Sequence, residues 1–375
     1  MNDPTRATQE ETLMRRALAL AREGWGQTAP NPMVGAVVVR DGHVVGEGYH
    51  EVYGGPHAEV NAIRTAGDRA RGATLIVTLE PCRHHGKTPP CTDAIIAAGI
   101  RRVVVAAADP SREAGGGAAL LEQAGIEVET GVLAGESREL NAAFFHAQTS
   151  RYPWTTLKLA VSIETAIADA RGSTSHLSGA EARHEVHLLR AGNDAIAVGV
   201  GTVLADDPQL TVRGVRPPRV PLRRVVFDRS LRTPLDARVI RTAREAPTIV
   251  VTRATSASHA RALADAGVDV IAAGDLAEGF RALRAAGIRS LLVEGGATLA
   301  GAVLADRLAH RLVIFQAPVA LGPRALHAFD GAPPAVLAEL EHYPVLERRT
   351  LGADVMTIYA TAGGEGGGSD VHGLG

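Results

Sequence analysis

Short apolar runs and amphipathic stretches alternate through the first 150 residues. Thr8 is expected to cap the first helix. Apolar residues spaced three or four positions apart predict helices at 8–22, 58–66, 93–98, 118–124 and 136–146. Runs rich in Val, Ile and Ala predict strands at 34–39, 44–49, 73–79, 103–107 and 126–130, with Asp41-Gly42 as a hairpin turn. This alternation predicts a three-layer α/β/α domain.

A second α/β pattern follows a break at Arg151-Tyr152-Pro153, so we place a domain boundary near residue 150 and predict domains at 1–150 and 151–362. Strands are expected at 155–162, 195–200, 224–228, 248–252, 268–272, 290–294 and 355–359, with a helix at 179–191 and further helices between the strands. Residues 363–375 are rich in Gly and polar, which predicts a disordered tail.

Composition narrows the class of protein. The 375 residues carry 39 Lys and Arg against 41 Asp and Glu, a net charge of −2, which disfavours broad binding of nucleic acid or of an anionic membrane surface. We find no apolar signal segment near Met1 and no uncharged run of the roughly 18 residues that a membrane span needs. Two cysteines are too few for a disulfide framework. A soluble cytoplasmic protein with reduced thiols is expected.

Those two cysteines carry the most specific chemistry of the chain. Cys82 follows Pro81, Cys91 follows Pro90, and both lie after the triplet His57-Ala58-Glu59. One imidazole and two thiolates hold a zinc ion and leave its fourth position open for water, and Glu59 is placed to move protons for that water. The order H-x-E, then P-C, then C is typical of zinc-dependent nucleobase deaminases. The alternative is two inert cysteines and a surface histidine.

The spacing of the cysteines carries information about the substrate. Many deaminases have two residues between them, whereas this chain has eight, Arg83 to Pro90. That insertion, HHGKTPPC at 84–91, and the word Pro30-Asn31-Pro32-x-Val34-Gly35 resemble the N-terminal half of the bifunctional riboflavin-pathway deaminase–reductase family. The resemblance implies a cytidine-deaminase-like domain and a diaminopyrimidinone substrate that carries a phosphoribosylamino group. Its implied substrate contacts are Asn31, His50 and Lys87; for His84 and His85 a solvated loop pair is the alternative.

The second half resembles the reductase part of the same family. The stretches VGTVLADDPQLTVR at 200–213 and LVEGGATLAG at 292–301 carry the resemblance, and no G-x-G-x-x-G follows the first strand. It implies a dihydrofolate-reductase-like α/β domain that uses NADPH. The implied NADPH contacts are Ala160, His176, Thr202, Asp206, Gly296, Ala297, Thr298, Leu299, Ala300, Gly301 and Ala302. The implied substrate contacts are Thr174, Arg190, Leu210, Arg213 and Glu294.

Lysine occurs at only two positions, Lys87 and Lys158, and both lie in these motif regions. Lys158, Asp206 and Glu294 are the candidates to shuttle protons while hydride reaches ribose C1′. Arg190 and Arg213 are candidate phosphate ligands because a guanidinium binds phosphate oxygens bidentately, and a surface ion pair is the alternative.

The chain departs from the family at four places. Ser162-Ile163-Glu164-Thr165-Ala166 stands where the family usually has Ser-Leu-Asp-Gly-Arg, His176 replaces a tryptophan, Arg83 replaces a serine, and Asp109-Pro110-Ser111-Arg112 replaces Asp-Pro-Asn-Pro.

From the resemblance of both halves we expect a bifunctional homo-oligomeric enzyme, a dimer or tetramer, that uses zinc and NADPH. One alternative is an active deaminase with an impaired reductase domain. Another is a nucleic-acid-editing deaminase, which the near-neutral charge disfavours.

Overall fold

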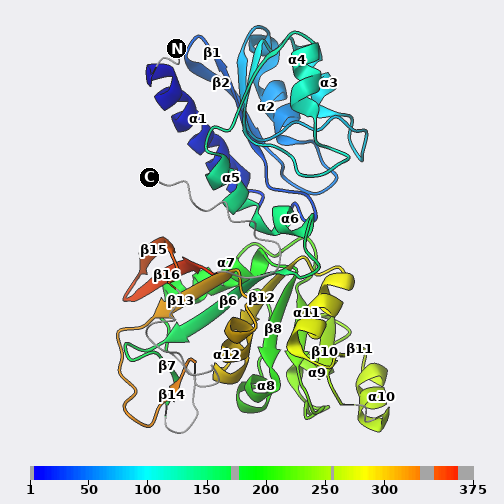
Figure 1. Cartoon of the computed structure of the whole chain (residues 1–375), viewed down its shortest axis with the longest axis vertical. Coiled ribbons are helices and arrows are strands. Elements are labelled where there is room, and N and C mark those ends of the chain that lie inside the picture. Colours follow the sequence, from blue (N-terminus) through cyan, green and yellow to red (C-terminus); the bar gives the residue numbers. More distant parts are fainter. Residues whose placement is uncertain (1–3, 170–176, 255–256, 330–341, 362–375) are drawn as a thin grey trace. The chain divides into compact units, whose positions relative to one another are not determined.

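The computed structural model describes residues 4–169, 177–254, 257–329 and 342–361. The chain divides into two compact units, Met1–Gln148 and Thr149–Gly375, two residues before the boundary near 150 that the sequence predicts. We call them the first and the second unit and describe each by itself (Figure 1). Thr174, His176 and the predicted tail at 363–375 lie outside the described residues.

The first unit is a five-stranded sheet with helices on both faces. The strand order is β2-β1-β3-β4-β5, and the strands are β1 (Gly35–Arg40), β2 (His43–Tyr49), β3 (Thr74–Leu79), β4 (Arg102–Ala107) and β5 (Glu127–Thr130). The pairs β1–β2 and β1–β3 are antiparallel, whereas β3–β4 and β4–β5 are parallel. Parallel strands need crossover helices, which cover the sheet from both sides.

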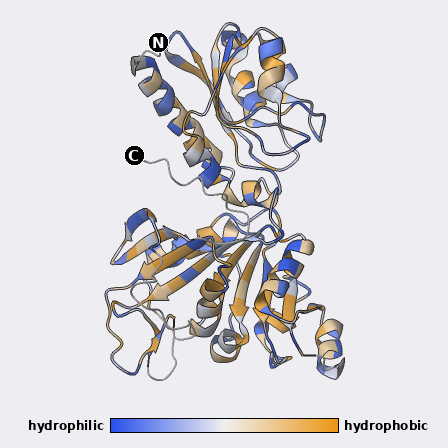
Figure 2. Cartoon of the chain, in the orientation of Figure 1, coloured by the Kyte–Doolittle hydropathy of each residue, from blue (hydrophilic) through white to orange (hydrophobic). Residues whose placement is uncertain are grey.

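Strand alternation sends apolar side chains to two separate cores. One face packs Val38, Leu75 and Val103 against α2 (Ala58–Ala66), α3 (Cys91–Ala98) and α4 (Gly117–Gln123). The other packs Val37 and Val104 against α1 (Pro4–Arg22) and α5 (Ala134–Leu140). Strands of both units are predominantly hydrophobic in Figure 2. The predicted three-layer α/β/α domain is confirmed.

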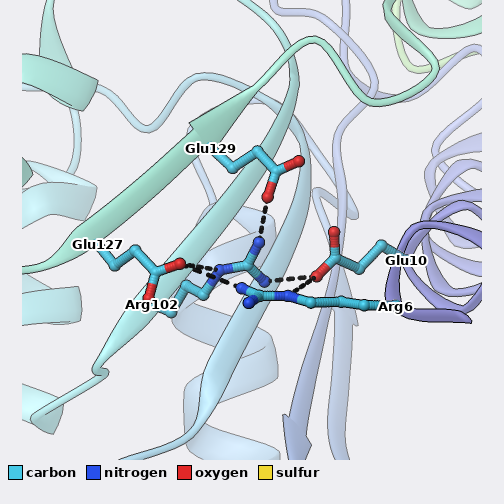
Figure 3. Close-up of polar contacts among 5 residues, drawn as sticks. All are labelled: Arg6, Glu10, Arg102, Glu127 and Glu129. Carbon is cyan, nitrogen blue, oxygen red and sulfur yellow. Dashed lines mark hydrogen bonds and ion pairs between the residues drawn. The ribbon is translucent and has the colours of Figure 1, made fainter. Parts of the chain in front are cut away.

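An ion-pair network joins the first helix to the edge of this sheet (Figure 3). Arg102 on β4 donates hydrogen bonds to Glu10 of α1 and to Glu127 and Glu129 of β5, and its side chain is only 4% exposed. Arg6 adds hydrogen bonds to Glu10 and Glu127. We call these five residues the Arg102 network. Because most of the guanidinium is out of water, these contacts fix where α1 packs.

The second unit contains a nine-stranded sheet in the order β11-β10-β9-β8-β12-β6-β13-β16-β15. Pairs from β11 to β13 are parallel, and β16 (Asp354–Ala360) and β15 (Val345–Leu351) complete the sheet antiparallel. The parallel strands are β6 (Trp154–Val161), β8 (Ala195–Gly199), β9 (Arg223–Phe227), β10 (Thr248–Thr252), β11 (Val268–Ala272), β12 (Ser290–Glu294) and β13 (Arg311–Gln316). A two-stranded sheet pairs β7 (Ala166–Ala168) with β14 (Leu326–His327).

Helices cover both faces of the nine-stranded sheet. Core residues of α11 (Leu276–Ala285) and α12 (Ala297–Ala305) pack on one face, where Phe280, Ala300 and Val303 are fully buried. Two other clusters of buried apolar residues include side chains of α7 (Ala180–Ala191), α8 (Val200–Asp206), α9 (Arg238–Arg241) and α10 (Ala257–Asp265). Apolar burial on both faces explains why these strands read as continuous runs of Val, Ile, Leu and Ala.

Three sequence predictions about elements were wrong. Thr8 does not cap the first helix, which begins at Pro4; the Thr12 hydroxyl donates to the Thr8 carbonyl inside it. The single helix expected at 136–146 is two helices, α5 and α6 (Ala142–Ala147), because Asn141 exchanges two hydrogen bonds with the backbone of Met33. The strand expected to reach residue 200 ends at Gly199, where α8 begins.

Candidate functional site

Three predicted metal ligands converge in the first unit. The His57 Nδ1, Cys82 Sγ and Cys91 Sγ atoms all lie within 4.8 Å of one another. Nδ1 of His57 is 3.1 Å from Cys91 Sγ and 3.5 Å from Cys82 Sγ, and the two sulfurs are 3.4 Å apart. Both cysteines are free and buried. One nitrogen and two sulfurs facing one point form the donor set of a catalytic zinc site with an open fourth position.

Local structure places each ligand at the end of an element. His57 is the N-cap residue of α2, Cys82 follows β3 after two intervening residues, and Cys91 is the first residue of α3. The hydrogen bond from Cys91 lowers the pKa of the Cys82 thiol, with further help from His57, whereas the same contact and burial raise the pKa of the Cys91 thiol. A thiolate is the form that binds metal. Cys82 is therefore the thiol that these contacts favour as a thiolate.

Glu59 lies beside these ligands with one oxygen unused. It is 3% exposed, and its Oε2 atom has no hydrogen-bond partner among the described residues. Burial raises the pKa of the Glu59 carboxyl, against an opposing effect of His57. A buried carboxyl with a raised pKa and a vacant oxygen is suited to accept and return a proton.

Two adjoining cavities of about 270 and 180 Å³ open onto the metal ligands, and both are lined by Asn31, His57, Cys82 and His84. The larger one also contains Lys87, whose Nζ lies 4.2 Å from the centre of the Tyr53 ring. The smaller one also contains His50 and Glu59. The structure thus brings together Asn31, His50 and Lys87, the three substrate contacts that the resemblance implies.

Hydrogen bonds hold His50, which lines the smaller cavity, in place. His50 contacts the Pro56 carbonyl through Nδ1 at 3.1 Å and the Asn31 amide through Nε2 at 3.3 Å. Its ring meets that of His57 edge to face, with centroids 5.2 Å apart. His50 therefore links a predicted substrate contact to a metal ligand. Burial lowers the pKa of His50, so its neutral form is favoured.

Sequence reasoning did not single out several cavity residues. Tyr53 and Thr88 line the larger cavity, and Glu80 and Asp109 line the smaller one. Thr88 lies inside the 84–91 word, which is a signal for it. Glu80 and Asp109 each follow a buried strand, and the carboxyl ends of parallel strands β3 and β4 meet at one edge. That placement could have identified Glu80 and Asp109 as candidate site residues from the sequence.

Three charged side chains meet in the second unit. Lys158 of β6 and Glu294 of β12 are paired in register, and Arg190 of α7 donates to both Glu294 oxygens at 2.6 and 2.9 Å. Arg190 also donates to the Thr211 carbonyl at 2.9 Å. Burial lowers the pKa of Lys158, against the effect of Glu294. Although burial favours the neutral form of Glu294, Arg190 and Lys158 outweigh it and lower the pKa of this carboxyl.

The other predicted reductase residues lie on several elements. Leu210 is buried, Arg213 is exposed and donates to Gln209, and Asp206 ends α8. Ala160 packs in the core beneath α7. Four of the predicted NADPH contacts on α12 are buried, whereas Thr298 is exposed and Ala302 is half-buried; the buried four are Ala297, Leu299, Ala300 and Gly301. Sequence reasoning missed His187, whose Nδ1 accepts the Arg213 amide at 3.2 Å.

The start of α12 fits a phosphate-bearing cofactor. Its N-cap is Gly296, and no side chain caps it, so the first amides of the helix are not taken by a capping group. A Cβ atom at Gly295 would stand 3.3 Å from Leu299 Cβ and 3.5 Å from the Ala300 nitrogen, and one at Gly296 would stand 3.7 Å from Thr202 Oγ1. A helix N-terminus behind a Gly-Gly turn is a favourable place for a pyrophosphate.

Comparison with known proteins decides the family. Residues 153–351 match the model of the RibD C-terminal domain, and residues 7–107 match the cytidine and deoxycytidylate deaminase zinc-binding region. The riboflavin biosynthesis protein RibD of Aquifex aeolicus is 46% identical over 320 residues, which is 84% of this chain and 88% of that protein. The chain belongs to the RibD family. RibD of Escherichia coli is 40% identical over 373 residues, 92% of this chain and 98% of that protein.

A solved structure is similar over most of the chain. The Thermotoga maritima diaminohydroxyphosphoribosylaminopyrimidine deaminase/5-amino-6-(5-phosphoribosylamino)uracil reductase superposes with a TM-score of 0.84 at 36% identity, covering 95% of this chain and 99% of that one. The predicted pairing of a cytidine-deaminase-like domain with a dihydrofolate-reductase-like domain is confirmed.

The chain is therefore a bifunctional enzyme of riboflavin biosynthesis, a deaminase and a reductase, which processes small molecules. Zinc serves the deaminase, and the His57, Cys82 and Cys91 donors fit it. NADPH serves the reductase, and the start of α12 fits its phosphates. Among the described residues, no helix is both long and apolar enough to cross a membrane.

Proposed function

We propose that the first unit deaminates 2,5-diamino-6-(5-phosphoribosylamino)pyrimidin-4(3H)-one and that the second unit reduces the ribose of the product to ribitol. The observation that carries the first step is the pair of cavities that joins the metal ligands and Glu59 to Lys87. A pyrimidine ring placed beside Glu59 leaves the larger cavity for the phosphoribosyl group, and the Lys87 ammonium complements its phosphate. The Thermotoga maritima relative bears the name of both reactions.

The deaminase step assigns one role to each group. His57, Cys82 and Cys91 would hold zinc, which when bound supplies Lewis acidity and lowers the pKa of water. Glu59 takes a proton from the attacking water at Oε2 and returns it to the departing amine. The water oxygen bonds to the ring carbon, the C–N bond breaks, and ammonia leaves. Asn31 and His50 orient the ring, because their side chains are tied to each other beside His57.

In the reductase step NADPH, when bound, supplies the hydride. The chain's own residues supply protons and hold the substrate. Lys158, within β6, is paired in register with Glu294, the last residue of β12, and we assign them, with Asp206, the proton that the ribose ring oxygen gains as the ring opens and is reduced. Thr174, Arg190, Leu210 and Arg213 are proposed substrate contacts. Arg190 positions the Glu294 carboxylate through its two hydrogen bonds.

Two single-step assays of the purified, zinc-loaded chain test the proposal. Ammonia release from the diaminopyrimidinone ribotide is the expected result of the first step. Loss of the nicotinamide absorbance of NADPH, when the deaminated intermediate is supplied, is the expected result of the second. Ammonia release without NADPH oxidation would instead support an active deaminase with an impaired reductase.

We further propose that the chain acts as a cytoplasmic homo-oligomer. The edge strand β15 supports association, since Val345 and Leu346 are 53% and 45% exposed and edge strands readily pair. The two buried free thiols support a reducing compartment. Light scattering during size-exclusion chromatography tests the association; a monomer at micromolar concentration would contradict it.

A further inference from the structure

A second buried glutamate near the deaminase site has no part in the reaction described above. Glu80 follows β3 directly, lies two residues before Cys82, and is 8% exposed. Its amide donates to the Ala107 carbonyl at 2.9 Å, which extends the pairing of β3 with β4 by one residue. A buried carboxylate costs free energy unless hydrogen bonds satisfy it, so its partners indicate what it is for.

The Glu80 carboxylate accepts three backbone hydrogen bonds, all from the segment 109–118. Oε2 accepts from the Asp109 amide at 3.0 Å, and Oε1 accepts from the Gly116 and Ala118 amides, each at 3.0 Å. Bonds from amides to an ionised carboxylate are stronger than neutral ones. One side chain thus holds both ends of the segment between β4 and α4.

The same segment packs on the residues that surround Cys82. A Cβ atom at Gly117 would stand 1.8 Å from the Pro81 carbonyl oxygen, so the two backbones are in direct contact. The Arg83 amide also donates to the Ala114 carbonyl at 3.3 Å. The segment 109–118 is therefore fixed against the stretch that carries a metal ligand.

This segment forms a wall of the smaller cavity. Asp109, Ser111 and Ala114 line the space of about 180 Å³ that Glu59 and Cys82 also line. Ser111 and Ala114 lie between the two points at which Glu80 holds the segment, so Glu80 restrains the wall from both ends. The wall faces the same cavity as Glu59, in which the proposed function places the reacting ring.

We propose that Glu80 is a positioning residue of the deaminase, which sets the substrate-facing wall formed by 109–118. The proposal rests on the deaminase activity proposed above. Loss of Glu80 then weakens substrate binding, because the wall is released, whereas the metal ligands and Glu59 stay in place. The result to look for is a rise in KM with kcat and zinc content retained.

The test compares Glu80→Gln and Glu80→Ala in the full zinc-loaded chain. A glutamine keeps one acceptor oxygen and turns an NH2 group toward the Asp109 or the Gly116 and Ala118 amides, so at least one hydrogen bond is lost. We expect KM for deamination to rise about tenfold in Glu80→Gln and more in Glu80→Ala, with kcat within about threefold of wild type. Zinc per chain and the reductase rate should equal those of wild type.

Two more variants make the result specific. Gly117→Ala keeps the carboxylate but pushes the segment off Pro81, and it should also raise KM. Glu122→Gln removes the same charge from the exposed face of α4 and should change neither constant. An unchanged KM in Glu80→Gln, or a loss of zinc that accounts for its whole defect, would overturn the proposal. If wild type itself releases no ammonia, the proposed function fails first and this inference falls with it.

Discussion

Two buried glutamates, 21 residues apart in sequence, show how surroundings give one residue type different roles. Glu59 keeps its Oε2 atom without a partner, and burial raises the pKa of its carboxyl. Glu80 has both oxygens engaged by backbone amides. With a vacant oxygen and a raised pKa, Glu59 is suited to exchange protons with a bound water, whereas the occupied oxygens of Glu80 suit it to hold a loop.

Glu59→Gln tests the first of these roles. The amide preserves size and polarity but cannot accept a proton, so deamination should fall about a hundred- to ten-thousandfold. The zinc content should stay the same, because the three metal ligands are untouched. Steady-state ammonia release and metal analysis measure both, and NADPH oxidation with the deaminated intermediate serves as an internal control. A Glu59→Gln enzyme with wild-type deamination would exclude the assigned role.

Glu294 predicts a pH dependence of stability in the second unit. Its pKa in the folded chain is lowered, so it stabilises the fold above the unfolded pKa of about 4.3, and that contribution is lost as the pH falls through the folded value. The difference in Tm between wild type and Glu294→Gln should therefore be largest at neutral pH and should shrink below about pH 4.

Thermal unfolding at several pH values checks this prediction. Glu181→Gln, on the exposed face of the helix that carries Arg190, is the matched control and should show a small difference that does not vary with pH. A Glu294→Gln difference that stays constant from pH 7 to about pH 3 would contradict the ion pair as the source of the stabilisation.

The zinc ligands were predictable from sequence, whereas residues that act over long sequence separations were not. His57, Cys82 and Cys91 belong to short words whose residue types and order already specify the chemistry. Arg102 and Glu80 act through residues far along the chain, since Arg102 reaches Glu10 across 92 positions and Glu80 reaches Ala118 across 38. No local sequence pattern encodes such a contact, because only the fold brings the two contacting residues together.

At the scale of elements, strands and long helices followed their apolar periodicity, and breaks set by tertiary contacts did not. The helix at 58–66 was predicted with its observed ends. The break at Asn141 depends on Met33, 108 positions away, so the periodicity through 136–146 could not show it. Strand β13 was not predicted, although its residues 312–315 form a continuous apolar run like those of the other parallel strands.

The turn at 162–166 places Thr165 in the left-handed region of the backbone. Thr165, where the family usually has glycine, takes a φ of +66°, a conformation that glycine adopts easily and a β-branched residue does not. Glu164, in the place of an aspartate, accepts the Leu321 and Gly322 amides, and hydrogen bonding, foremost with the Ser162 side chain, lowers its pKa to about 2. The positive φ therefore leaves strain at Thr165.

That strain predicts an order of stability. Thr165→Gly and Thr165→Val both lose the side-chain hydrogen bond to the Glu164 carbonyl, but only glycine relieves the positive φ. We expect Thr165→Gly to be the more stable of the two by about 1 kcal/mol, after the greater unfolded-state freedom of glycine is counted. Urea unfolding of both variants measures the difference. Equal stabilities would show that the turn carries no strain.

The Arg102 network predicts how firmly α1 is held. Arg102→Met should destabilise the first unit by about 3 kcal/mol, because it removes the buried centre of three carboxylates. Arg16→Met, on α1, breaks an ion pair between Arg16 and Glu47, whose side chains are 54% and 29% exposed, and it should cost less than about 1 kcal/mol. Denaturant unfolding monitored by circular dichroism compares them; similar losses would mean that burial does not strengthen the network.

At the scale of the whole molecule, each core cluster found among the described residues lies inside one unit. Those of the first unit join its sheet to α1 through α5, and those of the second join its sheet to α7 through α12. The metal ligands, Glu59 and both cavities come from residues below 149. Chains of about 150 residues bury enough surface to fold alone. The first unit therefore contains what folding and zinc binding require.

We predict that each unit keeps its own activity when the two units are separated. A fragment of residues 1–148 should bind one zinc per chain and deaminate with kcat and KM within about threefold of the intact enzyme, since every group assigned to that step is present. A fragment of residues 149–375 should oxidise NADPH when the deaminated intermediate is supplied. Adding one fragment to the other should leave each single-step rate unchanged. If the first fragment folds and holds zinc but deaminates only when the second is added, the deaminase site depends on a group that lies beyond residue 148.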